Sequence, residues 1–294
     1  MSLIYDVDFN SGTRVLSLLD KAGNTISSCE VPSKDVDDIT KPLTFRATQD
    51  GSTVALTKMG SPDGDFQTST DGGNTWTDYS IGRRITLKSG DEVSFRVKAD
   101  RSPYQSASDH YYFVMGGKIE AWHNVMSMYR ANDFATYDTA VGSLFAYLFD
   151  NCTSLTKAPV LPATTLTNDS CYYRMFDGCQ SLTKAPELPA TTLVLNCYGG
   201  MFSGCQSLTE APELPATTLA GSCYQNMFSG CQSLKEVRIS ATTTATSALS
   251  SWLSGVAATG DFYCDPNATI FPTGESGIPQ NWTRRNIADY PATP

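Results

Sequence analysis

The sequence predicts an α+β protein in which a short-repeat solenoid with a C-terminal cap follows a small antiparallel β-sandwich-like domain. The first observation is a motif, C-Y-x-x-M-F-[DS]-G-C-Q-S-L, at residues 171–182, 197–208 and 223–234, with a degenerate copy at 144–155. The second is a series of short alternating apolar and polar runs in 41–118, separated by turn residues. Self-similarity at a period of about 26 residues indicates a solenoid, whose units bury their apolar faces against one another.

The N-terminal segment, 1–40, is predicted to serve attachment or oligomerisation. Ile4–Phe9 alternates apolar and polar residues, as a half-buried strand does, and it has no evident partner strand in the chain. A turn and a second apolar run, Val15–Leu19, leave open a hairpin or a strand pair that a partner completes. We therefore expect a homo-oligomer that contacts other proteins through this segment.

The β-domain, 41–118, contains one sequence motif with a recognised geometry. Its residues match the Asp-box pattern S-x-D-x-G-x-T-W and are predicted to form a structural turn: Ser69, Asp71, Gly73, Thr75 and Trp76. A sialidase would need several boxes, an arginine cluster and a tyrosine nucleophile, and the chain has one box. Calcium binding by Asp63, Asp65 and Asp71 stays open, although the loops lack the spacing of a known calcium cage.

Each repeat in 144–245 is predicted to be a short helix, a turn, a short strand and an extended return. Cys171, Met175 and Cys179 are spaced i, i+4 and i+8, which places them on one face of a helix that Gly178 ends. The prolines of the following L-P-A-T-T-L stretch exclude helix there. Residues 119–143 are expected to cap the solenoid at its N-terminal end, and 246–294 form the C-terminal cap and a tail.

The cysteines are predicted to stack as small apolar residues, since free cysteine packs like a small hydrophobe. No C-x-x-C occurs and the chain has only two histidines, so we expect neither a metal site nor a cofactor. Disulfides are the alternative and would require an oxidising compartment. The cysteines of the predicted ladder are Cys152, Cys171, Cys179, Cys197, Cys205, Cys223 and Cys231.

Positions that differ between otherwise identical repeats form the candidate contact surface. Solvent-exposed residues can change without effect on the fold, so neutral variation is one explanation of these differences. The other is a binding face that changes gradually from aromatic to polar residues along the solenoid. The candidate residues are Tyr147, Lys157, Tyr173, Arg174, Lys184 and Glu210.

Charge and composition restrict the possible partners. The net charge of −9 disfavours binding to nucleic acid or to anionic membrane surfaces, because both bind positively charged protein surfaces. No apolar run approaches the length of a membrane span. The sequence contains no recognisable nucleophile–base pair or phosphate-binding loop, so a non-enzymatic role is expected.

The unit M-F-x-G-C-x-S-L-T-x-A-P-x-L-P-A-T-T-L resembles the BspA-type leucine-rich repeats of bacterial surface proteins and of phages of gut bacteria. The resemblance covers 144–245 closely. It extends to the Asp-box segment, to G-K-I-E-A at 117–121 and to G-I-P-x-x-W-T at 277–283. It implies a leucine-rich solenoid that mediates adhesion or protein contact, without catalytic residues.

The leading hypothesis is a phage virion protein, a decoration or fibre component assembled in the host cytoplasm. The N-terminal region would bind other virion proteins, and the solenoid a host surface protein or glycan. The segment after Met1 has no secretory signal, which favours the virion over the alternative, a secreted bacterial cell-surface adhesin. A carbohydrate-active enzyme is the third hypothesis.

Overall fold

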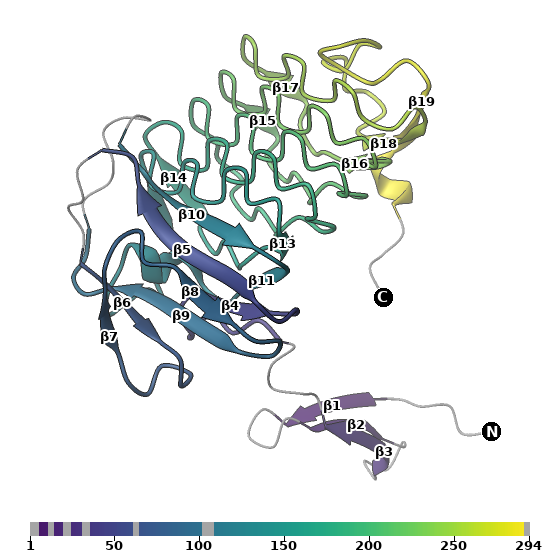
Figure 1. The fold of residues 1–294 in the computed structure, drawn as a ribbon. Helices are drawn as coiled ribbons and strands as arrows, with labels where there is room; N and C mark the ends of the chain where they lie inside the picture. The colour runs from purple at the N-terminus through teal and green to yellow at the C-terminus, as the bar shows by residue number, and fades with distance from the viewer. Residues whose placement is uncertain are drawn as a thin grey trace. The chain divides into compact units, whose positions relative to one another are not determined.

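The computed structural model describes residues 36–60, 65–101 and 109–290 in full (Figure 1). It also describes the backbone of three strands that precede them. The chain divides into two compact units, Met1–Asp38 and Ile39–Pro294. Apart from two 3-10 turns, the described elements are strands, joined by turns and extended segments. The expected α+β class is therefore wrong in its helical part, because the protein is mostly β.

The first unit contains a three-stranded antiparallel sheet in the order β1-β2-β3. Its strands are β1 (Asp6–Asn10), β2 (Val15–Leu19) and β3 (Thr25–Glu30). β1 pairs with β2 along its whole length, from Asp6 opposite Leu19 to Asn10 opposite Val15. The expectation that Ile4–Phe9 lacks a partner in the chain is wrong for residues 6–9; Ile4 and Tyr5 lie outside the described residues.

The second unit begins with two facing sheets. One has the order β10-β5-β8, and the other the order β13-β11-β4-β9-β6-β7. The strands of the first are β5 (Ser52–Lys58), β8 (Ile85–Leu87) and β10 (Tyr111–Gly116). Those of the second are β4 (Thr44–Ala47), β6 (Phe66–Ser69), β7 (Thr77–Tyr79), β9 (Glu92–Val97), β11 (Ile119–Trp122) and β13 (Leu155–Lys157).

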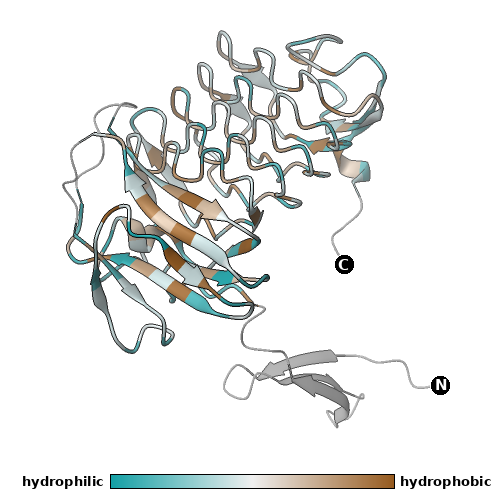
Figure 2. Ribbon diagram, viewed as in Figure 1, coloured by the Kyte–Doolittle hydropathy of each residue, from teal (hydrophilic) through white to brown (hydrophobic). Residues whose placement is uncertain are grey.

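Aromatic side chains fill the space between the two sheets. Phe45 on β4 meets Phe113 on β10 edge-on, with ring centroids 4.6 Å apart, and Phe95 on β9 packs against both. Apolar and polar residues alternate along several of the strands, as the brown and pale bands in Figure 2 show. The strands β5 and β9 each bury three consecutive residues, so both of their faces are covered there.

Both sheets continue into the first coil of the solenoid. The Phe113 amide on β10 donates to the Leu148 carbonyl at 2.8 Å, and β11 pairs in parallel with β13. The 3-10 turn η1 (Val125–Met128) lies next to β11 in the chain and is fully buried. The N-terminal end of the repeat stack is therefore covered, and sandwich and solenoid share one apolar core.

The segment predicted to be a helix in each repeat is a run of consecutive turns with a residue of positive φ at every fourth position. In the second coil these residues are Ser170, Arg174 and Gly178 (φ of 61°, 51° and 72°). An α-helix needs φ near −63° at every position, so a helix is excluded. Side chains four apart still share a face, which is why Cys171, Met175 and Cys179 are all fully buried.

The backbone hydrogen bonds of this segment alternate between two directions. In the second coil, from Tyr173 onward, amides of odd-numbered residues bond within the coil, as Met175 N–H does to the Tyr172 carbonyl at 3.2 Å. Amides of even-numbered residues bond to the next coil, as Phe176 N–H does to the Met201 carbonyl at 2.9 Å. The odd-numbered carbonyls accept from the preceding coil, so every peptide group of residues 172–178 is satisfied.

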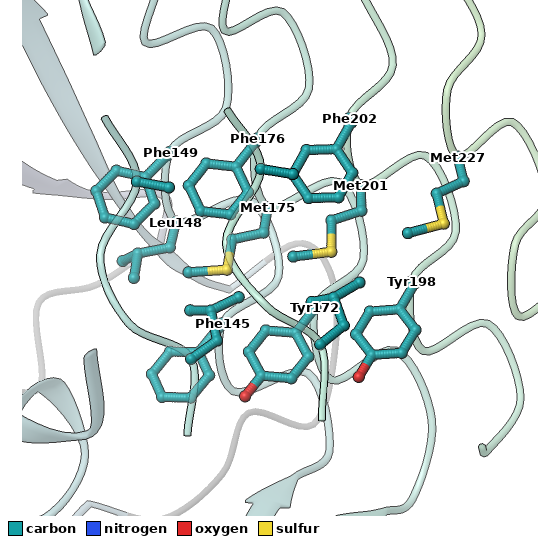
Figure 3. Packing of buried hydrophobic residues seen from close by; sticks show 14 of the residues in the cluster. Phe145, Leu148, Phe149, Tyr172, Met175, Phe176, Tyr198, Met201, Phe202 and Met227 are labelled. Atoms are coloured by element: carbon teal, nitrogen blue, oxygen red, sulfur yellow. The ribbon is translucent and has the colours of Figure 1, made fainter. Parts of the chain in front are cut away.

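Identical side chains stack from coil to coil above this hydrogen-bond ladder (Figure 3). The planes of successive phenylalanine rings differ by at most 16° and their centroids are 5.2–5.6 Å apart, within the range of favourable aromatic pairs. This stack begins in the sandwich and comprises Phe113, Phe149, Phe176, Phe202 and Phe228. A second stack comprises Phe145, Tyr172, Tyr198, Tyr224 and Trp252.

The repeat cysteines lie in this core as free thiols, all buried. The Cys179 thiol donates to the carbonyl of Phe149 in the preceding coil at 3.1 Å, and Cys205 and Cys231 make the equivalent bond one and two coils further along. Cys152 makes it to Phe113 at the sandwich. Burial raises the pKa of the thiols, to about 12 for Cys231.

The other sides of the coils are held by short parallel pairings and by the cap. β12 (Thr139–Val141) pairs with β14 (Thr165–Thr167), and β15 (Thr218–Leu219) pairs with β17 (Thr243–Thr244). β16 (Glu236–Arg238), β18 (Gly260–Cys264) and β19 (Trp282–Asn286) form a parallel sheet, and the 3-10 turn η2 (Ile287–Asp289) follows.

Two tryptophans fix the C-terminal cap. Trp252 is fully buried, stacks on Tyr224 and donates its indole N–H to the Gly277 carbonyl at 3.0 Å. Trp282 on β19 donates to the Ala257 carbonyl at 2.8 Å. Among the described residues, no helix has the length and apolar character needed to cross a bilayer.

The left-handed positions give a test of the turn geometry. A side chain at Gly204 (φ 71°) has ordinary space, since a Cβ there would lie 3.5 Å from the nearest atom, Gly178 Cα. Gly204→Val should therefore lower the free energy of unfolding by about 2 kcal/mol through backbone strain alone. Gly204→Asn should cost less than about 1 kcal/mol, because Asn151 occupies this place in the first coil. Urea denaturation measures both, and equal effects of the two variants would contradict the left-handed turn.

The buried thiols predict a loss of stability in alkali. Because the pKa of each thiol is raised in the folded state, the unfolded chain releases thiol protons first, near its ordinary pKa of about 8.5. The free energy of unfolding should then be constant below about pH 8 and fall progressively between about pH 8.5 and pH 10.

Urea denaturation at successive pH values measures this decline. Iodoacetamide at pH 8 provides the control: the eight buried thiols should react only after unfolding. A free energy of unfolding that stays constant to pH 10, or rapid alkylation of the native protein at Cys179 or Cys205, would contradict the account.

Candidate functional site

Three of the residues predicted to form a contact surface lie together on the turn side of the solenoid. The Tyr147 and Tyr173 rings meet edge-on with centroids 5.5 Å apart, and the Arg174 guanidinium lies 5.7 Å from the Tyr173 ring. His110, which precedes β10, stacks on Tyr147 at 4.6 Å. We call His110, Tyr147, Tyr173 and Arg174 the aromatic surface. The motifs of the repeats gave no indication of His110, because it lies outside them.

The backbone under the aromatic surface is strained. Tyr147 and Arg174 occupy the left-handed position of their coils, with φ of 61° and 51°. The later coils place Gly200, Asn226 and Ser251 at this position. Glycine and asparagine adopt this conformation at little cost, whereas a bulky side chain costs on the order of 1–2 kcal/mol. The first two coils thus hold residues that the turn itself disfavours.

The third coil makes room for the aromatic surface. A Cβ at Gly199 would lie 2.3 Å from Asn196 Oδ1 in its own coil and 3.1 Å from Tyr173 Cδ2, and a Cβ at Gly200 would lie 3.0 Å from Arg174 Cγ. All three distances are shorter than an ordinary contact, so larger residues would displace these side chains. The two glycines of the third coil, Gly199 and Gly200, therefore leave the space that Tyr173 and Arg174 of the second coil occupy.

Two half-buried carboxylates lie beside the aromatic surface. Burial raises the pKa of Asp150, and burial likewise raises the pKa of Asp177, where Arg174 opposes it. An ion pair of 3.3 Å joins Arg174 to Asp177. Aromatic rings next to carboxylates and a guanidinium offer stacking, hydrogen-bond donors and acceptors to a bound molecule.

The other three predicted contact residues lie elsewhere. Lys157 packs on Trp122, with its Nζ 3.7 Å from the ring centroid. Lys184 and Glu210 line a groove of about 480 Å³ between successive coils, which we call the proline groove. It is lined by Lys184, Ala185, Glu187, Leu188, Pro189, Glu210, Ala211, Pro212, Glu213, Pro215, Glu236, Arg238 and Tyr290. The six predicted residues thus belong to more than one surface.

The C-terminal end of the chain completes the proline groove. The Tyr290 hydroxyl donates to Glu236 Oε1 at 2.5 Å, and this bond raises the pKa of Tyr290 to about 12. Arg238 stacks on the Tyr290 ring at 4.2 Å and pairs with Glu213. Repeat comparison could not identify Tyr290, because that residue follows the repeats by more than forty positions and reaches the groove only through the parallel pairing of β18 and β19.

The Asp-box residues form the tight turn between β6 and β7. The Ser69 hydroxyl donates to Asp71 Oδ1 at 2.6 Å, and the amide and hydroxyl of Thr75 donate to the same carboxylate. These donors hold the pKa of the Asp71 carboxyl well below its usual range. Trp76 donates its indole N–H to the Gly73 carbonyl at 2.9 Å. The three hydrogen bonds that the Asp71 carboxylate accepts from Ser69 and Thr75 all lie within the turn.

The question of calcium concerns the same loops. Asp63 lies outside the described residues, and Asp65 and Asp71 flank β6. Within 36–60, 65–101 and 109–290, no three histidine, cysteine or acidic side chains are grouped to hold a metal ion.

Comparison of the chain with protein-family models, with curated proteins and with solved structures gave no match. The features that bear on function are therefore the aromatic surface, the proline groove and the sequence pattern of the repeats.

Proposed function

We propose that this chain is a non-enzymatic structural protein of a phage particle, a decoration or fibre component, whose repeat domain mediates adhesion or protein contact. The observation that carries the adhesive role is the aromatic surface. Tyr147 and Arg174 remain at left-handed positions that the later coils give to Gly200 and Asn226. Strain that the fold does not need is characteristic of functional positions.

The arrangement of the solenoid supports binding rather than conversion. Its buried stacks are nearly identical from coil to coil, so the differences between coils lie mainly on the surface. Tyr173 and Arg174 sit on a rigid ladder of backbone hydrogen bonds, which lowers the entropy lost when a partner binds. Tyrosine and arginine are also the residues that most often dominate binding energy.

The location in a virion is supported by the resemblance of the repeats to those of gut-phage proteins. Labelling of purified particles with an antibody against this chain tests it. Bound antibody on the particles is the expected result. Antibody bound to the surface of uninfected bacterial cells, and not to particles, would instead support the secreted adhesin.

A graft between coils tests the aromatic surface. Tyr173→Gln, Arg174→Asn and Asp177→Ser together give the second coil the residues that the fourth coil carries at Gln225, Asn226 and Ser229. Adhesion of the labelled protein to host cells should fall by about 30-fold, the effect expected when a hot spot worth about 2 kcal/mol is lost. The free energy of unfolding should change by less than about 1 kcal/mol, because Asn226 has the required φ of 54°.

The matched control is Gln225→Ala with Ser229→Ala, at the equivalent positions two coils further along. It should bind host cells as the unchanged protein does. Undiminished adhesion of the grafted protein, with its fold intact, would remove the aromatic surface from the proposed function.

A further inference from the structure

The proline groove opens where the backbone ladder of the solenoid is interrupted. Residues 183–193 form the extended part of the second coil, and no backbone-to-backbone hydrogen bond joins them to the rest of the described chain. Pro186 and Pro189 have no N–H to donate. One coil further along, Ala211 N–H bonds to the Glu236 carbonyl at 3.1 Å and Leu214 N–H to the Arg238 carbonyl at 3.2 Å. The peptide groups of 183–193 are therefore left to water or to a bound molecule.

Side-chain packing nevertheless keeps the unbonded segment in place. Leu182, Ala185, Leu188, Ala190 and Leu193 are each at most 9% exposed and point into the common core. The segment thus offers an extended backbone with ordered, unpaired peptide groups. Peptide groups of this segment that face the groove can hydrogen-bond to a peptide that lies in it.

The groove has an excess of negative charge. Four carboxylates line it, those of Glu187, Glu210, Glu213 and Glu236, against the two cations Lys184 and Arg238. Arg238 is already paired with Glu213, and Glu236 accepts from Tyr290.

Two of the carboxylates are available to a ligand. No hydrogen bond or ion pair joins the side chains of Glu187 and Glu210 to another described residue, and both side chains are exposed. A cationic group entering the groove would find these two carboxylates unpaired.

The aromatic ring in the groove argues against a sugar. Carbohydrates stack on an open ring face, but the Arg238 guanidinium lies over the Tyr290 ring at 4.2 Å and Tyr263 meets that ring edge-on at 4.9 Å. The prolines and Leu188 instead provide apolar surface for the methylene stems of long side chains. The volume of about 480 Å³ lies within the range of ligand sites, which is about 300–1,000 Å³.

We propose that the proline groove binds an extended peptide segment of a partner protein that carries lysine or arginine side chains. The peptide lies in the groove over residues 183–193, and its cations meet Glu187 and Glu210. This deepens the proposed function, since it rests on the repeat domain being a binding module, but it uses a different surface from Tyr147, Tyr173 and Arg174.

Fluorescence polarisation with the full chain and a labelled octapeptide of alternating lysine and threonine tests the proposal. Binding should be at least tenfold tighter than that of the matched glutamate–threonine octapeptide, and it should weaken as salt is raised. Glu187→Gln with Glu210→Gln should weaken binding of the basic peptide at least tenfold. These side chains are exposed, so the variant should unfold at the same urea concentration as the unchanged protein.

The charge-matched control is Glu92→Gln with Asp169→Asn, which removes two carboxylates outside the groove and should leave peptide binding unchanged. An equal loss in both double variants, or binding of the two peptides with equal affinity, would overturn the proposal, because only the net charge of the protein would then matter.

The two proposals fail separately. The three-residue graft in the second coil should bind the basic peptide normally, and the Glu187→Gln, Glu210→Gln variant should adhere to host cells normally. Loss of peptide binding in the graft would assign the peptide to the aromatic surface and overturn the groove site.

Discussion

The whole solenoid depends on one constraint, a residue of positive φ at every fourth position of the turn segment. This residue redirects the backbone so that alternate amides point along the coil and across to the next one. Half of the amides of a turn segment thus bond within the coil, and the other half bond to the next coil and fix its register. The register then places equal side chains above one another, and the phenylalanine, tyrosine and cysteine stacks follow from it.

The sequence predicted the solenoid but not the conformation of its turn segment. The spacing of Cys171, Met175 and Cys179 correctly indicates a shared inward face, because side chains four apart share a face in a helix and in a four-residue turn alike. The distinguishing signal was present in Gly200 and Gly204, which stand four apart where a helix would disfavour both. That signal is weak in the second coil, where Arg174 takes the position of Gly200 against its own preference.

The candidate sites were predictable to different degrees. Tyr147, Tyr173 and Arg174 were identifiable because they interrupt a repeat, and interruptions can be read from one sequence. Lys184 and Glu210 were identifiable in the same way, but the groove around them was not. Its shape depends on missing hydrogen bonds along 183–193 and on Tyr290, which is brought in by the cap. The sequence alone also did not indicate that Gly199 and Gly200 make room for Tyr173 and Arg174.

Backbone hydrogen bonds are distributed unequally around the second coil. On the turn side the amides of 172–179 are all hydrogen-bonded, and this side carries the aromatic surface, whereas the extended segment of the second coil is held by its buried side chains alone. Hydrogen exchange of the native protein, resolved by residue, tests this division most directly. The account predicts slow exchange for the amides of 172–179 and rapid exchange for Lys184, Glu187, Thr191 and Thr192. Equal protection of the two segments, or rapid exchange at 172–179, would contradict it.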